Sequence, residues 1–80
     1  MGDTRKAIDY YEQRLVIARQ LGDTRGEANA LWNSAMALDQ LHQRPKAISR
    51  AVAALRIYEQ IEDPYARKVR PVLAKWRGET

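Results

Sequence analysis

Amide and apolar side chains recur at helical spacing in the middle of this chain, at Asn29, Trp32, Asn33, Met36 and Gln40. An amide offers both a donor and an acceptor, so it can hydrogen-bond a peptide backbone of any sequence. A tryptophan and a methionine add one large and one adaptable apolar contact. Side chains of these types suit contact with a peptide or protein partner. The alternative is that Trp32 and Met36 pack against the last helix as part of the core.

The last part of the chain would extend the same surface. Val69 and Trp76 fall on the equivalent face of its helix, together with Val72 and Leu73, and Arg70 stands at the rim. We therefore add Val69, Arg70 and Trp76 to the candidate partner-binding residues.

Side chains that carry catalysis are scarce. His42 is the one histidine and cysteine is absent, so the chain lacks the usual nucleophile–base pairs and metal-ligand sets. The acidic residues are scattered as single charges, and the loop from Gly22 to Gly26 lacks the strand and the lysine of a phosphate-binding loop. We expect no enzymatic activity, no cofactor and no metal. We interpret His42 as a structural residue at a helix C-terminus, where a cation is favoured.

Length and composition predict one small domain over residues 1–80. Apolar residues make up 45% and charged residues 30%, a mixture typical of folded helical proteins. No apolar run approaches the roughly 20 residues that cross a bilayer, and the first residues lack the apolar segment of a secretory signal. We expect a cytoplasmic protein that does not enter a membrane.

The positive charge is concentrated at the end of the chain. After Pro64 there are five cations and one acid, Glu79, which gives +5 − 1 = +4 and equals the net charge of the whole sequence. We interpret this tail as a solvated basic face that also suits a helix C-terminus. The alternative function is binding of nucleic acid or an acidic partner through this last helix, with Arg50 and Arg56 beside it.

Apolar residues at three- and four-residue steps predict an all-α chain with helices at about 4–21, 25–42, 45–61 and 64–77. Glycines and prolines separate these segments. Expected N-terminal caps are Asp3, a capping box from Thr24 to Glu27, and Asp63 before Pro64. Because Pro71 removes a helical hydrogen bond, we expect a kink or a break near Arg70.

The first and third helices are similar at a distance of forty residues. Lys6, Ala7 and Ile8 return as 46–48, and Leu15 returns as Leu55. A period of this length indicates units that bury their apolar faces by stacking on neighbours.

The register of residues 28–61 resembles the tetratricopeptide repeat (TPR), in a longer-period form. Leu31, Ala35 and Leu38 match helix A of that family, and Ala47 and Leu55 match helix B. The resemblance covers about residues 3–77 and implies four antiparallel helices in the order B–A–B–A. It implies a scaffold that binds peptides on its concave helix-A side, where Asn33 matches an asparagine common in the family. The sequence departs from the family pattern at three positions. Arg14 stands where the family has an alanine, and Pro71 and Lys75 make the last helix a poor match.

In the order B–A–B–A, the first helix has no helix A before it and therefore lacks a packing neighbour on one side. We therefore expect a fragment of a longer array, with Met1 added or fortuitous, or a small protein that completes its stack by association. Apolar residues left open, such as Tyr10 and Ile17, predict a homodimer.

Overall fold

The computed structural model describes residues 3–78, and Met1 and Glu79 therefore lie outside the described residues. Four helices follow one another: α1 (Thr4–Leu21), α2 (Thr24–Gln40), α3 (Arg44–Gln60) and α4 (Ala66–Trp76). No strand occurs between residues 3 and 78. The predicted all-α class is confirmed. No helix in this part of the chain is long and apolar enough to cross a bilayer.

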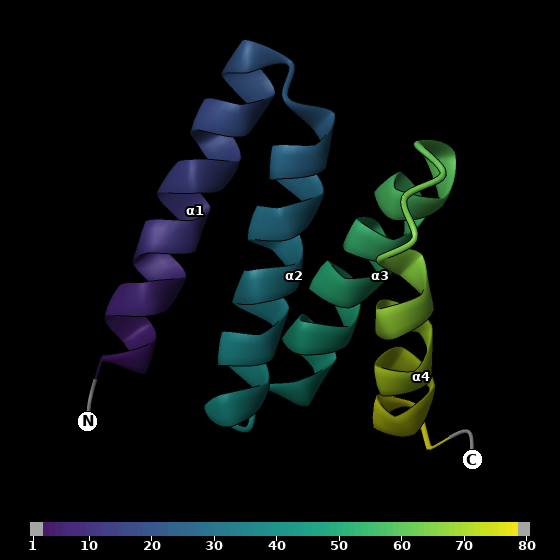
Figure 1. Ribbon diagram of the computed structural model, residues 1–80. Coiled ribbons are helices and arrows are strands. Elements are labelled where there is room, and N and C mark those ends of the chain that lie inside the picture. Colours follow the sequence, from purple (N-terminus) through teal and green to yellow (C-terminus); the bar gives the residue numbers. More distant parts are fainter. Residues whose placement is uncertain (1–2, 79–80) are drawn as a thin grey trace.

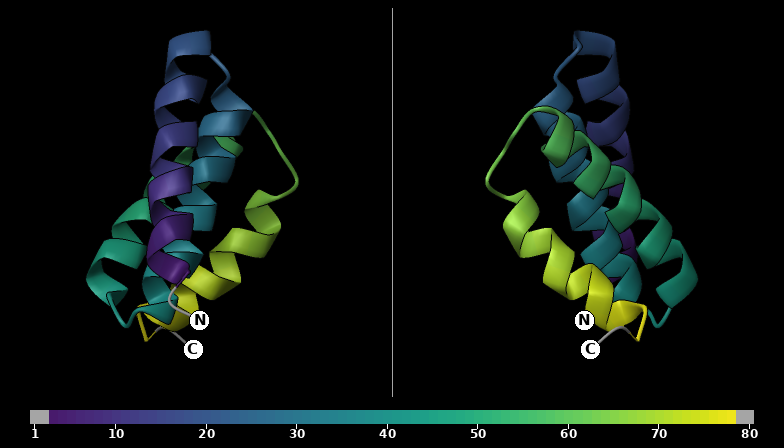
Figure 2. Two further views of the ribbon diagram at one scale, coloured as in Figure 1. Left: turned by 90° about the vertical axis from the view of Figure 1, so that its left-hand side faces the viewer. Right: turned by 90° about the vertical axis from the view of Figure 1, so that its right-hand side faces the viewer.

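The four helices stand side by side in a row, and each runs opposite to the one before it (Figure 1). Helix α2 makes extensive contacts with both α1 and α3, whereas α4 shares a smaller contact with α3. Viewed along the row, α3 and α4 cross obliquely, and the chain between them swings outward (Figure 2). A stack of Trp32 on Trp76, with ring centroids 6.0 Å apart, adds a contact between α2 and α4.

Small residues bring the helix axes together. Five alanines in α2 and α3 are 0% exposed: Ala28, Ala35, Ala47, Ala51 and Ala54. Because a methyl group occupies so little space, the separation of two helices decreases where alanines face the contact. Larger side chains fill the spaces on either side, among them Leu15, Leu31, Tyr58, Val69 and Leu73.

The three connections between helices share one hydrogen-bond pattern. Each contains a residue in the left-handed conformation, Gly22, His42 or Glu62, with φ of 68°, 60° and 56°. In each connection this residue donates its N–H to the carbonyl three residues back, and the next residue donates to the carbonyl five residues back, at 2.8–3.3 Å. These are the bonds of a Schellman ending, which satisfies the last carbonyls of a helix. The pattern recurs every twenty residues.

Helix starts differ from the expected caps. Asp23, not Thr24, caps α2, because its carboxylate accepts the N–H of Gly26 at 2.9 Å. Glu27 pairs instead with Arg19 of α1 at 3.1 Å. The predicted capping box is therefore wrong, and its glutamate links two helices.

Helix α4 also differs from the sequence prediction. It starts at Ala66, after a turn in which Asp63 accepts the N–H of Tyr65 at 2.9 Å. Pro71 does not break it, and one helix continues to Trp76. Both Pro71 and Arg67, four residues earlier, are exposed. Water can therefore reach the carbonyl that the proline leaves without a helical partner.

Two residues that continue the apolar periodicity of their helices are open to solvent. Leu21 is 76% exposed and Ile61 is 39% exposed. Both occupy the last turn of their helices, where the chain bends away and the periodic pattern no longer implies a neighbour.

The left-handed residue after α3 yields a stability prediction. Glycine adopts a positive φ without steric cost, whereas a Cβ in this conformation costs about 1 kcal/mol. We expect Glu62→Gly to raise the free energy of unfolding by about 1 kcal/mol over Glu62→Ala, measured by urea denaturation. The alanine variant is the control for the lost charge. Equal stability of the two variants would contradict the left-handed assignment.

Packing yields a second prediction. Ala47 is 0% exposed, so a leucine at this position has no free space. We expect Ala47→Leu to destabilise the chain by ~1–3 kcal/mol. Arg56→Leu, an exposed position on the same helix, is the control and should leave the melting temperature nearly unchanged.

Candidate interaction surface on helix α2

Helix α2 exposes one continuous stripe of side chains. Arg25, Asn29, Asn33, Met36 and Gln40 are exposed and follow one another at steps of three or four residues, which places them on one face of the helix. Eight other residues of α2 are buried. The central helix thus meets solvent mainly through three amides, one thioether and one guanidinium.

A hollow of about 440 Å3 runs along one side of this stripe. Tyr10, Tyr11 and Arg14 of α1 line it, opposite Asn29 and Asn33 of α2. Aromatic rings and a cation thus border the amides on this side.

A second hollow, of about 340 Å3, lies on the other side. Trp32, Tyr58 and Tyr65 contribute to its lining, and it shares Arg25, Asn29 and Asn33 with the first. The shared residues form a ridge, so the two hollows are neighbouring parts of one surface.

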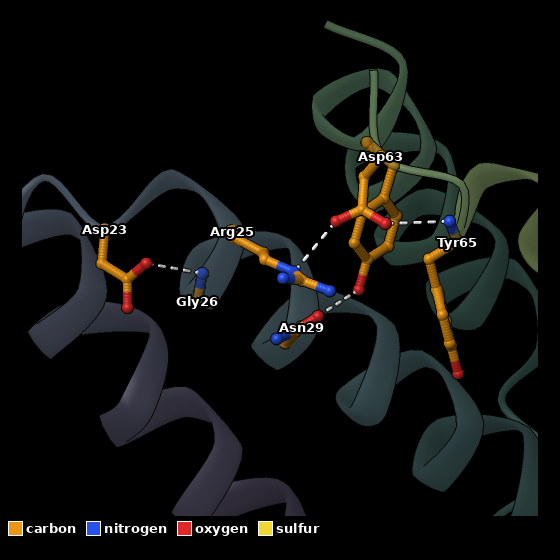
Figure 3. A network of polar contacts seen from close by, with 7 residues as sticks. Asp23, Arg25, Gly26, Asn29, Asp63 and Tyr65 are labelled. Carbon is orange, nitrogen blue, oxygen red and sulfur yellow. Dashed lines mark hydrogen bonds and ion pairs between the residues drawn. The ribbon is translucent and has the colours of Figure 1, made fainter. Parts of the chain in front are cut away.

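An ion pair fixes the upper end of this surface. Arg25 at the start of α2 points its Nε at the carboxylate of Asp63, 2.9 Å away, in the connection before α4 (Figure 3). The side chain of Asp63 is only 8% exposed, and it also accepts the N–H of Tyr65. A carboxylate that is shielded from water needs such partners. The pair therefore links the start of α2 to the start of α4.

Asn29 is held by a buried phenol. The hydroxyl of Tyr58 donates a hydrogen bond to Oδ1 of Asn29, and Tyr58 is 1% exposed. Burial raises the pKa of Tyr58 to about 12, Tyr65 and Asp63 add to the effect, and Arg25 opposes it. The phenol therefore stays protonated at neutral pH and remains a donor. With its oxygen occupied in this way, Asn29 keeps its amide nitrogen for a ligand.

Two cations and two acids lie at this surface. Arg14 and Arg25 line the larger hollow, whereas the two acids nearby have internal roles: Asp23 caps α2 and Asp63 pairs with Arg25. Guanidinium groups and amide nitrogens are hydrogen-bond donors. The arrangement can bind carbonyl oxygens and carboxylates.

Four of the predicted partner-binding residues, Asn29, Asn33, Met36 and Gln40, lie together on the exposed stripe. Trp32 does not, because it is 7% exposed and stacks on Trp76. Trp32 packs against the last helix, which is the alternative interpretation of the sequence. Met36, by contrast, is 42% exposed.

The three predicted residues of α4 are separated by the structure. Val69 is 0% exposed and belongs to the core, which corrects its placement on the surface. Arg70 is exposed but is oriented toward α3, where its Nη2 lies 2.9 Å from the carboxylate of Glu59. Trp76 is half-buried, with the guanidinium of Arg44 5.5 Å from its ring centroid.

Sequence reasoning missed several residues of this surface. Arg25 precedes Asn29 by four residues, so the helical spacing alone could have found it. Tyr10 and Arg14 come from α1 and Tyr65 comes from the connection before α4. Only the tertiary arrangement brings these residues to the stripe.

A third hollow, of about 650 Å3, opens between α1 and α3. Its charged groups have both signs, and an ion pair of Arg50 with Glu12 crosses between the helices. No group of three or more metal-ligating side chains forms in residues 3–78. Arg5, Lys46 and Arg50 contribute the positive charges of its lining, and Asp9 and Glu12 contribute the negative ones.

Comparisons of the chain with models of protein families, with curated proteins and with solved structures give no match. The resemblance to the TPR family therefore depends on the residues that carry it.

The phenol of Tyr58 yields a prediction for alkaline pH. Its pKa rises from 10.0 to about 12 on folding, so the neutral form is favoured in the folded chain. This stabilisation is complete below pH 10 and is lost as the pH rises from 10 to 12. We expect the free energy of unfolding to fall across this window by up to about 1.4 kcal/mol per pH unit from this group.

Denaturation with urea at several pH values measures this slope. Tyr58→Phe should reduce it, whereas Tyr10→Phe, at a position 56% exposed, should keep it. An unchanged slope in Tyr58→Phe would show that the phenol does not resist ionisation.

Proposed function

We propose that this chain is a non-catalytic protein-interaction module that binds an extended peptide along the exposed stripe of α2. The observation that carries the proposal is the ridge of Arg25, Asn29 and Asn33 between two hollows. A flat helix face would offer a ligand only one side, whereas this ridge has aromatic walls on both sides.

The chemistry of the surface favours an acidic segment. Amides pair with the peptide backbone, and the guanidinium of Arg14 attracts carboxylates. The 17 residues of α2 extend about 25 Å at 1.5 Å per residue, which matches roughly eight residues of extended peptide. Asn29 is already oriented by Tyr58, so less conformational freedom is lost when a ligand binds.

We further propose that the four helices form a TPR-like array in the order B–A–B–A. Supporting observations are the identical turns after Gly22, His42 and Glu62 and the buried alanines at Ala35 and Ala47. In this interpretation α2 and α4 are the A helices, and their shared side is the ligand-binding side.

A second candidate function comes from the charge of α4. This helix contains no acidic residue, and Arg67, Lys68 and Lys75 are exposed on it. Such a basic face suits binding of nucleic acid through phosphates, with an affinity that falls steeply with salt.

Designed probes test the peptide proposal. We would measure binding of a fluorescent ten-residue peptide with glutamate at alternate positions, and of the same peptide with lysine there. We expect the acidic peptide alone to bind. Arg14→Gln should weaken its affinity about 2–5-fold, and Asn33→Ala about 2–10-fold.

Matched controls are Arg56→Gln and Gln60→Ala, exposed positions on α3, which should bind like the wild type. Equal losses in the controls, or equal binding of both peptides, would overturn the proposal. Tighter binding of a ten-nucleotide single strand, with a steep salt dependence that decreases in Lys75→Gln, would favour the second candidate.

A further inference from the structure

Helix α1 carries most of the exposed apolar surface of the described chain. Six large apolar side chains in residues 3–78 are exposed, and four of them are on α1: Tyr10 at 56%, Val16 at 53%, Ile17 at 42% and Leu21 at 76%. Such a concentration on one helix is unusual for a surface that meets only water.

Val16 and Ile17 lie on the outer side of α1, whereas Tyr10 also borders the hollow next to α2. Leu15 and Ala18 are the buried residues of this helix and mark the side that meets α2. At 100° per residue, Ile17 and Val16 point away from that side, and the uncharged Gln13 falls between them. The outer face is thus apolar and amide-bearing over the second half of the helix.

We propose that the outer face of α1 is a self-association surface, which docks on the same face of a second copy with the two α1 helices antiparallel. The two-fold axis passes near Gln13. The inference is independent of the function proposed for α2.

A second copy fits this face better than any head-to-tail arrangement. The opposite end of the row is α4, whose exposed residues are Arg67, Lys68, Arg70, Pro71 and Lys75. Packing that cationic face on α1 would bury charges against apolar side chains without partners. The apolar face of α1 is therefore complementary to the same face of a second copy. A contact with two-fold symmetry joins two copies and leaves no free face from which a fibre could grow.

The charges of the face agree with this geometry. Residues at a two-fold axis meet their own copies, so a charged residue there would repel itself. Gln13 is uncharged, and Lys6 and Asp9, of opposite sign, lie toward the N-terminal end. In an antiparallel pair about Gln13, Lys6 lies opposite Gln20 and Asp9 lies opposite Ile17, so like charges do not meet across the axis.

The size of the face predicts a weak dimer. Helix α1 has 18 residues, so the strip is about 27 Å long and roughly 10 Å wide. A contact of that size falls at the low end of specific interfaces, below ~1,200 Å2 in total. We expect monomers at low micromolar concentration and dimers well above it. The stripe of α2 remains open in the dimer, because it lies on a different side of the row.

Sedimentation equilibrium over a dilution series tests the proposal. Wild type should pass from 9.2 kDa toward twice that mass as its concentration rises. Ile17→Lys should weaken dimerisation by at least about tenfold, because each copy then places an unpaired ammonium in the contact. Ile61→Lys is the matched control: the same residue type, 39% exposed, changed in the same way but directly after α3. It should dimerise like the wild type, and circular dichroism would establish that both variants fold.

A wild type that stays monomeric at millimolar concentration would overturn the proposal, and so would equal effects of the two lysine variants. Monomers that bind anionic lipid vesicles through Ile17 would assign the face to a membrane surface instead.

Because the sequence contains no cysteine, a single introduced cysteine can test the position of the two-fold axis. Gln13→Cys should form a disulfide-linked dimer under mild oxidation much faster than Gln60→Cys, an exposed control on α3. Equal rates would exclude the antiparallel arrangement about Gln13.

Discussion

The fold depends on the close approach of α2 to its neighbours. Fully buried alanines such as Ala28, Ala35 and Ala51 let the axes come together, and this contact encloses α2 on nearly every side. The enclosure has a direct result for the surface. Most of the exposed side chains of α2 lie on one line, so a ligand that approaches this face meets the amide stripe and the rings beside it.

Polar contacts then determine how that stripe is presented. Tyr58 reaches from α3 to hold Asn29, and Asp63 reaches from the next connection to hold Arg25. Both anchors lie in or next to α3, behind the surface that a ligand would touch. The same shielding from water that keeps the phenol of Tyr58 protonated also makes its hydrogen bond to Asn29 persistent. Asn29 and Arg25 are therefore positioned by residues from α3 and from the connection after it.

The sequence predicted the helices well and the details of their ends poorly. Apolar periodicity and glycine or proline breaks located all four elements, because these signals are local. Thr24 had capping-box spacing, but Asp23 caps α2, since two adjacent residues can both cap and only the backbone geometry selects one. Trp32 sat on the predicted surface by its position in the helix, yet α4 folds back and covers it with Trp76. Such a contact depends on the oblique crossing of α4, which no local pattern encodes.

Trp32 and Trp76 are the two tryptophans of the chain, and they stack across the junction of α2 and α4. Because α4 has the smallest contact with the rest of the row, it is the element that can detach while α1, α2 and α3 stay folded. Detachment would separate the two indoles and lose little helix. Intrinsic fluorescence of this protein consequently reports the attachment of the last helix, a local equilibrium, in addition to the unfolding of the domain as a whole.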